Sequence, residues 1–396
     1  MEENEARGFS ADDSITVCTN CFDDIGIKKF IETAASNNDN CDFCADLGGL
    51  TCNFEAAMEH IIGSIHREWS HPEQDGMSYN TKEGGWLGGV IDTWELFAEI
   101  GFEANHPDLT DLIYESVNDD QWCRRNHRSQ SDDEILISGW ITFVDFVLHK
   151  ARYTFFKTIP QNYDMNQHDE MNPVAILNSL ADMVERLNLM TLLKSDQKIF
   201  RVRIVDIDRN LNSAEELGSP PTENCTLANR MSPAGISMFY GSFEVETAIK
   251  ETYIPDKTKK KKAVCGIFQP IRDLTLLDLT KIPKVPSLFN AEFHEVRHAI
   301  IFLNDFLQDF TKSISRDDRA HIEYVPTQIV SEFFRNCFIK KNGEHVDGIV
   351  YPSSKNVAHS SIVIFANNDQ CRKEQTIWRN TNSQILQLVK VNDIEL

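Results

Sequence analysis

The sequence has few basic residues and no long apolar run. Its 39 Lys and Arg residues stand against 61 Asp and Glu residues, which gives a formal net charge of -22. Such a charge repels a phosphate backbone, so the composition disfavours nucleic acid as a partner. The apolar runs, such as "ISGWITFVDFVLH", stay below the roughly 18 residues that a membrane helix needs. The first ten residues, MEENEARGFS, resemble neither a signal nor a transit peptide, so we expect a cytoplasmic protein without a membrane partner.

The length and the cysteine content limit the architecture. A chain of 396 residues exceeds the roughly 250 to 300 residues at which a single core stops growing, so we expect two or three domains. The ten cysteines follow no secretory leader, which predicts reduced thiols. Any regular cysteine spacing therefore indicates metal binding rather than disulfides.

Four cysteines do have regular spacing. Cys18, Cys21, Cys41 and Cys44 form the pattern C-x2-C-x19-C-x2-C. Two residues between paired cysteines let a tight turn aim both sulfurs at one ion, and two such pairs complete a tetrahedral site. Because four thiolates leave no open coordination position, the pattern predicts structural Zn²⁺ in a small module over residues 1–55. The twelve acidic and three basic residues of this module speak against a nucleic-acid finger.

Residues 56–195 follow a helical period. Ser131 and Glu134 form a capping box before an apolar run, and Asn172 followed by Pro173 opens a further helix. Shorter helical candidates cover 55–69, 90–102 and 107–117. The pattern predicts an α-helical bundle of about five helices.

From residue 196 the pattern changes to short strands with few helices. Strands are predicted at "KIFRVRIV", "AVCGIF", "LTLLDL", "GIVYP", "SIVIF" and "LQLVKV", and helices near 297–313 and 327–338. Residues 196–396 are therefore predicted to form an α+β domain with a mixed sheet. The expected fold class is multi-domain: a zinc module, a helical bundle and this α+β domain.

Residues 229–251 concentrate polar chemistry on short elements. "SPAG" predicts a turn, "ISMFY" a strand, and Ser242 the N-cap of a helix that reaches Glu251. Arg230 offers a fork to phosphate, Tyr240 a ring that stacks on a planar base, and Glu251 a carboxylate that stabilises an oxocarbenium ion. Together they suit cleavage of a nucleotide N-glycosidic bond. On composition alone, the alternative that the three residues are unrelated stays open.

Several blocks, in order, resemble the RES domain family, whose fold is similar to that of ADP-ribosyltransferase toxins. They are "FRVR", "NRMSPAGISMFYGS", "VETAIKE", "EYVPTQIVSEFFR" and "DGIVYPSS". The paired cysteines and the helical region also resemble the N-terminal region of the HEPN/RES architecture. The resemblance implies an ADP-ribosyltransferase-like fold for 196–396 and an HEPN-like bundle for 56–195. It also implies NAD⁺ as substrate and a bacterial toxin with a cognate antitoxin protein as partner.

The resemblance further implies roles for single residues. Arg230 would bind the NAD diphosphate and ribose, Tyr240 would stack on nicotinamide, and Glu251 would stabilise the oxocarbenium ion and orient the attacking group. Ser353 matches the family serine, with Ser354 as the alternative. Arg201 matches an arginine at the start of the first strand that helps to hold phosphate. Where the family often has "GRWN" this chain has "NRMS", so the contacts beside the arginine differ.

The leading hypothesis is an NAD glycohydrolase or phosphorylase. ADP-ribosyl transfer to a protein or small-molecule acceptor shares its chemistry up to the oxocarbenium ion, and a catalytically inactive NAD-binding or assembly module is a third hypothesis. RNA cleavage is disfavoured, because catalytic HEPN ribonucleases carry an arginine four to six positions before a histidine. No such pair lies on a well-formed predicted helix of the bundle. Whether the chain forms a homo-oligomer stays open.

Overall fold

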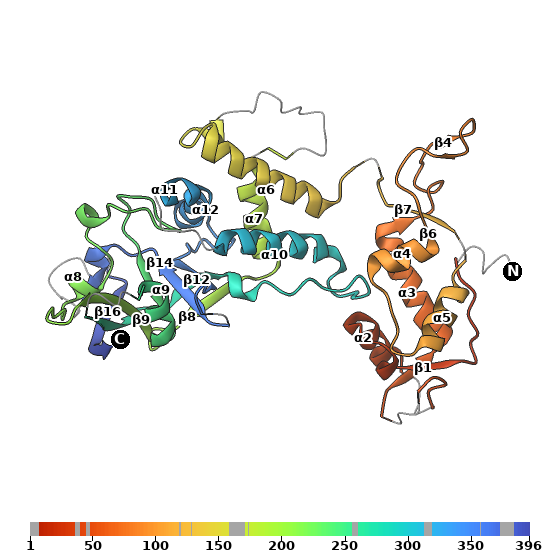
Figure 1. The fold of residues 1–396 in the computed structure, drawn as a ribbon, viewed down its shortest axis with the longest axis horizontal. Coiled ribbons are helices and arrows are strands. Elements are labelled where there is room, and N and C mark those ends of the chain that lie inside the picture. Colours follow the sequence, from red (N-terminus) through yellow and green to blue (C-terminus); the bar gives the residue numbers. More distant parts are fainter. Residues whose placement is uncertain are drawn as a thin grey trace. The chain divides into compact units, whose positions relative to one another are not determined.

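The chain folds into two compact units (Figure 1). The computed structural model describes residues 8–35, 40–44, 48–118, 120–127, 129–157, 171–172, 174–255, 260–312, 319–356, 358–372 and 384–396. Unit 1 consists of residues 1–134 and 283–301, and unit 2 of residues 135–282 and 302–396. The prediction of a multi-domain chain is confirmed.

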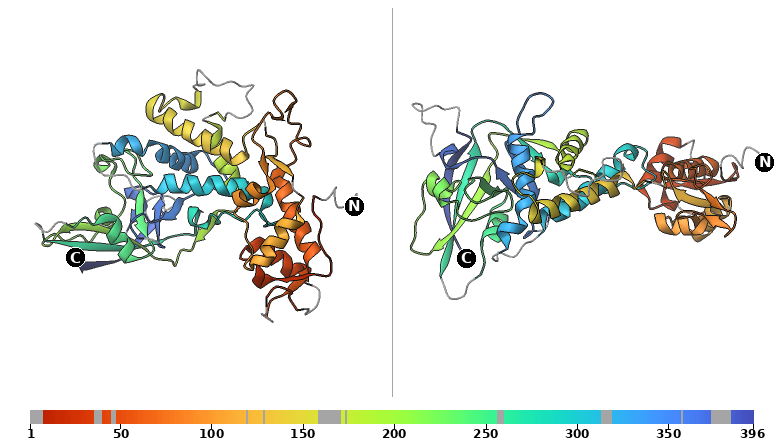
Figure 2. Two further views of the ribbon diagram at one scale, coloured as in Figure 1. Left: turned by 45° about the vertical axis from the view of Figure 1, so that its right-hand side comes forward. Right: turned by 90° about the horizontal axis from the view of Figure 1, so that it is seen from above.

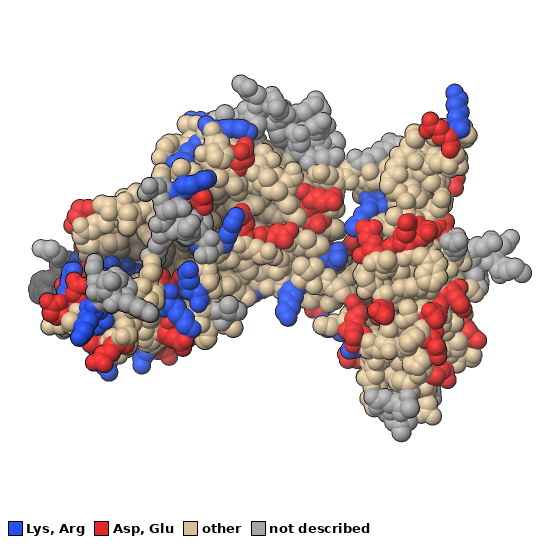
Figure 3. Space-filling view, in the orientation of Figure 1, with Lys and Arg blue, Asp and Glu red and all other residues tan. Residues whose placement is uncertain are grey.

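The two units differ in charge. Unit 1 holds 31 acidic and 10 basic residues, a net charge of -21, whereas unit 2 holds 30 acidic and 29 basic residues, a net charge of -1. Acidic side chains also outnumber basic ones on the face of unit 1 that Figure 3 shows. Unit 2 therefore presents little long-range repulsion to an anionic ligand, while unit 1 attracts cations.

Unit 1 contains helices whose starts are set by polar caps. Asp24 accepts hydrogen bonds from the first amides of α2, Asn53 caps α3, and Asp92 forms a capping box with Glu95 of α4. Proline stands in the first turn of α5. The helices are α2 (Ile25–Ala34), α3 (Phe54–Glu68), α4 (Thr93–Ile100) and α5 (Pro107–Ser116). The helices predicted at 55–69, 90–102 and 107–117 are confirmed.

Short strands join these helices around one core. This core extends from Phe9 to Phe289 in sequence and includes Cys18 and Cys21. The antiparallel strand pairs are β1 (Thr16–Cys18) with β2 (Thr51–Asn53), β4 (Tyr79–Asn80) with β5 (Gly85–Trp86), and β7 (Gln121–Arg124) with both β3 (Trp69–Ser70) and β6 (Ile91–Asp92). The first cysteine pair and the helices of unit 1 thus share a single core.

His298 and Asp133 form an ion pair within unit 1. His298 Nδ1 lies 2.5 Å from Asp133 Oδ1. The hydrogen bond to Asp133 raises the pKa of His298 above its usual 6.5. Burial acts to raise the pKa of Asp133, but hydrogen bonds from His298 and Ser131 lower it to about 2, from 3.8.

This pair predicts a pH-dependent stability of unit 1. A raised histidine pKa stabilises the fold below pH 6.5, and this contribution is lost as the pH rises through the folded pKa. A lowered aspartate pKa stabilises the fold above pH 3.8, and this contribution is lost as the pH falls toward 2. The difference in unfolding free energy between wild type and His298→Gln, measured by urea unfolding, should therefore be largest between these limits. A difference in unfolding free energy that does not change with pH would contradict this prediction. The control is His321→Gln, at an exposed position of unit 2.

Unit 2 is built on a mixed sheet. In the described part of the chain its strand order is β15-β16-β11-β9-β10-β14-β13-β12-β8. The pairs β12–β13 and β15–β16 are parallel, and the other neighbours are antiparallel. The strands are β8 (Met190–Leu193), β9 (Ile199–Asp206), β10 (Phe239–Ser242), β11 (Lys261–Pro270), β12 (Leu274–Asp278), β13 (Gly348–Pro352), β14 (Ser360–Ile364), β15 (Cys371–Arg372) and β16 (Leu386–Glu395). The predicted mixed sheet is confirmed.

The two faces of this sheet carry different cores. Helix α9 (Val245–Thr252) packs through Ala248 against Val202 of β9 and Cys265 of β11. The opposite face holds Ile199 and Phe239, together with helix α8 (Ala214–Leu217). Because successive side chains of a strand point to opposite faces, neighbouring residues of β9 and β10 serve different cores.

Further helices accompany the sheet. They are α6 (Asp132–His149), α7 (Ala175–Arg186), α10 (Arg297–Thr311), α11 (Ala320–Glu323) and α12 (Val325–Asn336). Within unit 2, α6 and α10 lie side by side (Figure 2), since the Trp140 indole donates to Asp309 at 2.9 Å and its ring packs on Phe306. Among the described residues, no helix has the length and apolar character needed to cross a membrane.

The structure agrees with some, but not all, of the helix starts predicted from the sequence. Glu134 accepts a hydrogen bond from the Ser131 amide at 3.0 Å, as a capping box requires at the start of α6. Pro173, predicted at the start of α7, lies outside the described residues. The prediction of Ser242 as the N-cap of α9 is wrong, because Glu244 occupies that position and the Ser242 hydroxyl donates to the Glu244 carbonyl at 2.6 Å.

The strand predicted at "ISMFY" begins later than expected. β10 starts at Phe239 instead of Ile236. Gly235 has a positive φ of 88°, and the Ser237 hydroxyl donates to the Pro220 carbonyl at 2.6 Å. The turn therefore extends through Ser237 and leaves a shorter strand.

Candidate functional site

Glu251 stands at the centre of a polar group in unit 2. It lies in the last turn of α9, and its Oε1 atom accepts hydrogen bonds from Ser353 Oγ at 2.5 Å and from Ser361 Oγ at 3.4 Å. Ser353 directly follows β13, and Ser361 lies on β14. Residues far apart in sequence thus converge on one carboxylate, and Glu251 and Ser353, both predicted site residues, are among them.

The backbone that follows Ser353 orients its hydroxyl. The amides of Lys355 and Asn356 donate to Ser353 Oγ at 3.2 and 3.0 Å. The oxygen is occupied as an acceptor, so its proton is free to be donated to Glu251. Ser353 is buried, whereas Ser354 is exposed. The geometry favours Ser353 over Ser354 as the site serine.

Helix α9 also holds the segment that carries Ser353. Asn356 Nδ2 donates to Thr247 Oγ1 at 2.7 Å, and Lys250 Nζ donates to Asn356 Oδ1 at 3.0 Å. Thr247 and Lys250 lie on α9 together with Glu251. Three side chains of one short helix therefore fix the position of this segment relative to the carboxylate.

Tyr240 lies on β10 with its hydroxyl engaged. Its Oη atom is 2.8 Å from Ser232 Oγ. Burial raises the pKa of Tyr240 to about 12, although its bond to Ser232 acts in the other direction. The phenol is therefore neutral at physiological pH and offers a fixed ring and a hydroxyl, not a charge.

Arg230 lies in the loop before β10. Its Nη1 atom donates to the Phe310 carbonyl at 2.8 Å, and its guanidinium carbon lies 5.7 Å from the centre of the Tyr324 ring. This hydrogen bond to Phe310 uses one nitrogen of the guanidinium group. The arginine is thus held by a backbone carbonyl near the end of α10 and by an aromatic ring, rather than by a carboxylate.

Buried polar residues of α12 hold the loop that carries Arg230. Thr327 Oγ1 donates to the Arg230 carbonyl at 2.5 Å, and Gln328 Nε2 donates to the Asn229 carbonyl at 2.8 Å. Asn229 and Ser232 also bond to each other through their backbones. The block "EYVPTQIVSEFFR" thus positions "NRMS", which lies about 100 residues earlier in the chain.

Tyr351 belongs to the same group, although the sequence reasoning missed it. Tyr351 is opposite Ser361 on β14, and Tyr240 is opposite Val363. Positions two apart on a strand share a face, so both tyrosines lie on one face of the sheet. Burial raises the pKa of Tyr351, and the neighbouring Tyr240 and Glu251 raise it further, while Arg230 acts to lower it. What the strand pairing establishes is that Tyr351 shares the sheet face of Tyr240.

Arg201 is the site candidate that the structure places elsewhere. It shares the sheet face of Ile199, and its guanidinium carbon lies 5.3 Å from the centre of the Phe239 ring. From there its Nη1 atom donates to the backbone carbonyl of Tyr240 at 2.5 Å. Burial lowers the pKa of Arg201. The Arg201 side chain thus lies on the face of the sheet opposite to the Tyr240 side chain and, of Tyr240, contacts only the backbone.

This arrangement combines one carboxylate, one guanidinium and two neutral phenols. The carboxylate can stabilise a developing positive charge, and its hydroxyl donors fix its orientation. The guanidinium can bind an anionic group, and the rings can pack on a planar heterocycle. Such a set matches the breaking of a bond between a ribose carbon and a cationic nitrogen base.

The four predicted metal-ligand cysteines come together in unit 1. The sulfur of Cys18 lies 3.6 Å from that of Cys21 and 3.3 Å from that of Cys44, and Cys21 lies 3.5 Å from Cys41. A tetrahedral Zn–S site with bonds of about 2.3 Å has sulfurs about 3.8 Å apart. The donor set and its spacing therefore fit a metal ion.

The backbone around this cluster is closely fitted. A Cβ atom at Gly49 would lie 3.1 Å from the Cys18 sulfur, so a larger residue there would require its neighbours to shift by a few tenths of an ångström. The Thr16 amide donates to Asp42 Oδ2 at 2.7 Å, which ties the second cysteine pair to β1. Residues other than the cysteines, Gly49 and Asp42, therefore help to fix the backbone around the two cysteine pairs.

A second group of side chains with metal-binding atoms lies elsewhere in unit 1. Asp75, Cys123 and His127 have such atoms within 4.8 Å of one another. His127 Nδ1 already lies 2.6 Å from Asp75 Oδ2, and the amides of Asn126 and His127 also donate to Asp75. These bonds account for the contact between Asp75 and His127 without an ion.

Two known families match separate parts of the chain. Residues 34–161 match the family described as HEPN/RES N-terminal domain 1, and residues 203–385 match the family described as RES domain. The second match spans Arg230, Tyr240, Glu251 and Ser353, whereas Arg201 lies just before it. Searches of curated proteins and of solved structures found no match.

Proposed function

Because the chain joins an HEPN/RES N-terminal domain 1 to a RES domain, we propose that unit 2 cleaves NAD between nicotinamide and ribose. The observation that carries the proposal is the hydrogen bond from Ser353 to Glu251, which lies beside the strand β14 that pairs with the strands of both Tyr240 and Tyr351. The near-neutral charge of unit 2 agrees with an anionic dinucleotide as substrate. We extend the resemblance to the fold and propose that unit 2 is ADP-ribosyltransferase-like.

The proposed reaction needs little proton transfer before bond cleavage. The nicotinamide of NAD⁺ is a pyridinium, so when the bond from ribose C1′ to nitrogen breaks, the electron pair goes to nitrogen and neutral nicotinamide leaves. The ribose becomes an oxocarbenium ion, which water attacks at C1′ with loss of a proton. The protein therefore acts mainly by positioning the substrate and by stabilising positive charge.

Glu251 has the central role in this proposal. Its carboxylate stabilises the oxocarbenium ion, and its Oε1 atom is held by Ser353 and Ser361. We assign the other oxygen, Oε2, to a ribose hydroxyl or to the attacking water. The two serine hydroxyls fix the carboxylate before substrate binds, so less reorganisation is required during the reaction.

The remaining residues bind the substrate. Arg230 contacts the diphosphate through the part of its fork that does not bond to Phe310. Tyr240 packs on the nicotinamide ring, and Ser232 holds its hydroxyl. For Arg201 the geometry favours a supporting role over phosphate binding, because it contacts the Tyr240 carbonyl from the opposite face of the sheet.

ADP-ribosyl transfer is the second candidate function. It differs only in the group that attacks C1′, and the same side chains would support it. The use as a toxin, and an antitoxin protein as partner, follow from the resemblance to RES domains alone. We further infer that the four cysteines hold structural Zn²⁺, because their spacing fits a tetrahedral site and four thiolates leave no open position.

The proposal is tested by nicotinamide release from pure NAD, with the adjacent serines as a matched pair. Ser353→Ala should lower the rate about tenfold, because it removes a hydrogen bond to a charged group. Ser354→Ala should leave the rate unchanged, since this side chain is exposed. Free ADP-ribose as the product supports hydrolysis, and labelled proteins in a lysate support transfer. Wild-type protein that releases no nicotinamide and does not bind NAD would refute the assignment.

A further inference from the structure

Asn356 lies in the segment between β13 and β14, three residues after Ser353. It is half-buried, and its side chain reaches helix α9. Its Nδ2 atom donates to Thr247 Oγ1 at 2.7 Å, and its Oδ1 atom accepts from Lys250 Nζ at 3.0 Å. Both ends of the side-chain amide are therefore engaged on the helix that carries Glu251.

The backbone of Asn356 is bonded on both sides as well. Its amide donates to Ser353 Oγ at 3.0 Å, and its carbonyl accepts from the His359 amide at 3.1 Å. The Ser353 amide in turn donates to the His359 carbonyl at 2.9 Å. Ala358 has a positive φ of 70°, which is unfavourable for a residue with a Cβ atom. The segment therefore needs bonds that hold it, and Asn356 contributes them from its backbone and its side chain.

The partners of the Asn356 side chain admit one orientation of its amide group. The Lys250 ammonium is a donor only, so it must face Oδ1. The Thr247 hydroxyl donates to Glu244 Oε2 at 3.3 Å, which leaves its oxygen to accept from Nδ2. The position thus requires an acceptor and a donor in one short side chain, and asparagine supplies both.

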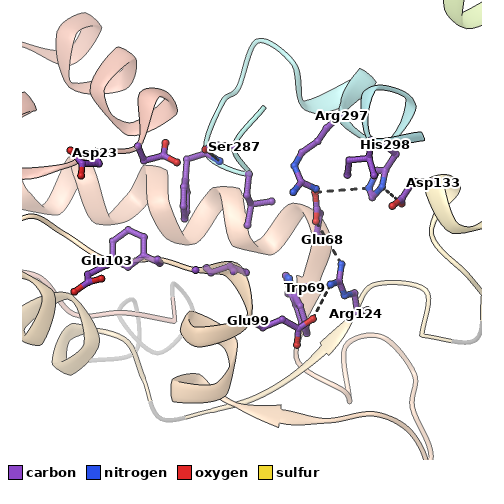
Figure 4. Close-up of a pocket in the computed structure, with 17 residues that line it drawn as sticks. Asp23, Glu68, Trp69, Glu99, Glu103, Arg124, Asp133, Ser287, Arg297 and His298 are labelled. Atoms are coloured by element: carbon purple, nitrogen blue, oxygen red, sulfur yellow. Dashed lines mark hydrogen bonds and ion pairs between the residues drawn. The ribbon is translucent and has the colours of Figure 1, made fainter. Parts of the chain in front are cut away.

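The polar groups that line the cavity of unit 1 in Figure 4 are fixed in a different way. There Arg297 Nη1 lies 2.7 Å from Glu68 Oε1, so opposite charges hold each other. Of the groups that bond to Asn356, the Lys250 ammonium is charged, and the two hydroxyls and the backbone amide are neutral. Hydrogen bonds between neutral groups depend strongly on direction. The bonds of Asn356 therefore orient groups rather than balance charges.

We propose that Asn356 is a positioning residue that holds the Ser353 hydroxyl on Glu251. Ser353 Oγ accepts from the amides of Lys355 and Asn356, so its proton points to the carboxylate. The side chain of Asn356 ties this amide to α9, so Ser353 and Glu251 keep their relative position when substrate binds. The consequence for catalysis rests on the function proposed above, whereas the hold on Ser353 does not.

Variants on both sides of the contact test the proposal. Asn356→Ala should lower kcat for nicotinamide release about tenfold and change KM by less than about twofold, because it loosens a bond to a charged group and leaves the substrate-binding side chains in place. Thr247→Val should act similarly, since it removes the acceptor for Nδ2, and Thr247→Ser, which keeps the hydroxyl, should not. Asn342→Ala, at an exposed turn of unit 2, is the matched control.

A double variant separates positioning from a general loss of stability. Ser353→Ala combined with Asn356→Ala should have a kcat within about twofold of that of Ser353→Ala alone, because Asn356 acts through that hydroxyl. Two independent effects would instead multiply to a loss of about 100-fold. Melting curves of the single and double variants check that each of them folds.

Amide hydrogen exchange tests the hold on Ser353 without NAD. In Asn356→Ala and in Thr247→Val, the peptide that contains Ser353 and Lys355 should exchange at least about tenfold faster than in wild type, while a peptide from β16 should not change. Wild type that releases no nicotinamide would refute the proposed function, and the exchange rates would then decide the inference. Unchanged exchange in Asn356→Ala, or multiplied losses in the double variant, would overturn the positioning role.

Discussion

Replacing Glu251 with Gln should lower the rate of nicotinamide release from NAD by about 100- to 1,000-fold. The amide keeps the shape of the side chain but removes the negative charge that, in our proposal, stabilises the oxocarbenium ion. It can still accept from Ser353, so the local structure should persist. Steady-state assays at saturating NAD should show the loss in kcat, because this charge is used mainly in the transition state.

Glu246→Gln is the matched control for this variant. Glu246 lies on the same helix, where it forms an exposed pair with Lys250 at 2.6 Å. Surface pairs of this kind contribute little to stability, so the control should keep the wild-type rate. If the two variants keep equal activity, Glu251 is not the charge that stabilises the transition state. Adding Ser353→Ala to Glu251→Gln should cost little more, because the serine acts through the carboxylate.

Removing the metal that we propose for the four-cysteine cluster should unfold unit 1. Structural Zn²⁺ sites contribute apparent binding free energies of about 10 to 16 kcal/mol, which is as large as the whole stability of a typical domain. Cys18 and Cys21 belong to the continuous core of this unit, so loss of the ion exposes core residues of α3. Circular dichroism during titration with a strong chelator should show a loss of helix, and metal analysis of the untreated protein should give about one zinc per chain.

Substitutions separate the metal from the cysteines themselves. Cys44→Ser should lose the zinc and destabilise unit 1, whereas Cys337→Ser, at an exposed position outside the cluster, should do neither. A Cys44→Ser variant with wild-type melting behaviour would show that the four sulfurs pack as neutral thiols. Addition of zinc to the chelated wild type should restore the helix signal, and it should not restore that of Cys44→Ser.

The sequence was sufficient for much of the secondary structure. Strands such as β13 and β14 have continuous β-branched runs, and the starts of α3 to α5 coincide with capping residues or proline. β8 was not predicted, because its four residues carry no clear alternation and it is defined by pairing with β12. The N-cap at Ser242 failed for a related reason, since a glutamate without a capping hydrogen bond carries no signal in the sequence.

The site was predictable only where residues lie close together in a family pattern. Arg230, Tyr240 and Glu251 share one short segment, and Ser353 follows a strand with a recognisable motif. Tyr351 adjoins that motif, but its approach to Tyr240 depends on the pairing of both strands with β14. The position of Arg201 on the opposite face follows from its strand register. Single-sequence patterns do not contain that register.

The contact between Arg201 and the Tyr240 carbonyl shows how β9 and β10 separate. The ladder between them consists of one residue pair, Ser242 with Phe200, and a continued register would bring Val202 opposite Tyr240. Instead, a long side chain spans the place where the next backbone bond would form. The two strands can therefore diverge beside the site without leaving that carbonyl unbonded, because the long Arg201 side chain reaches it.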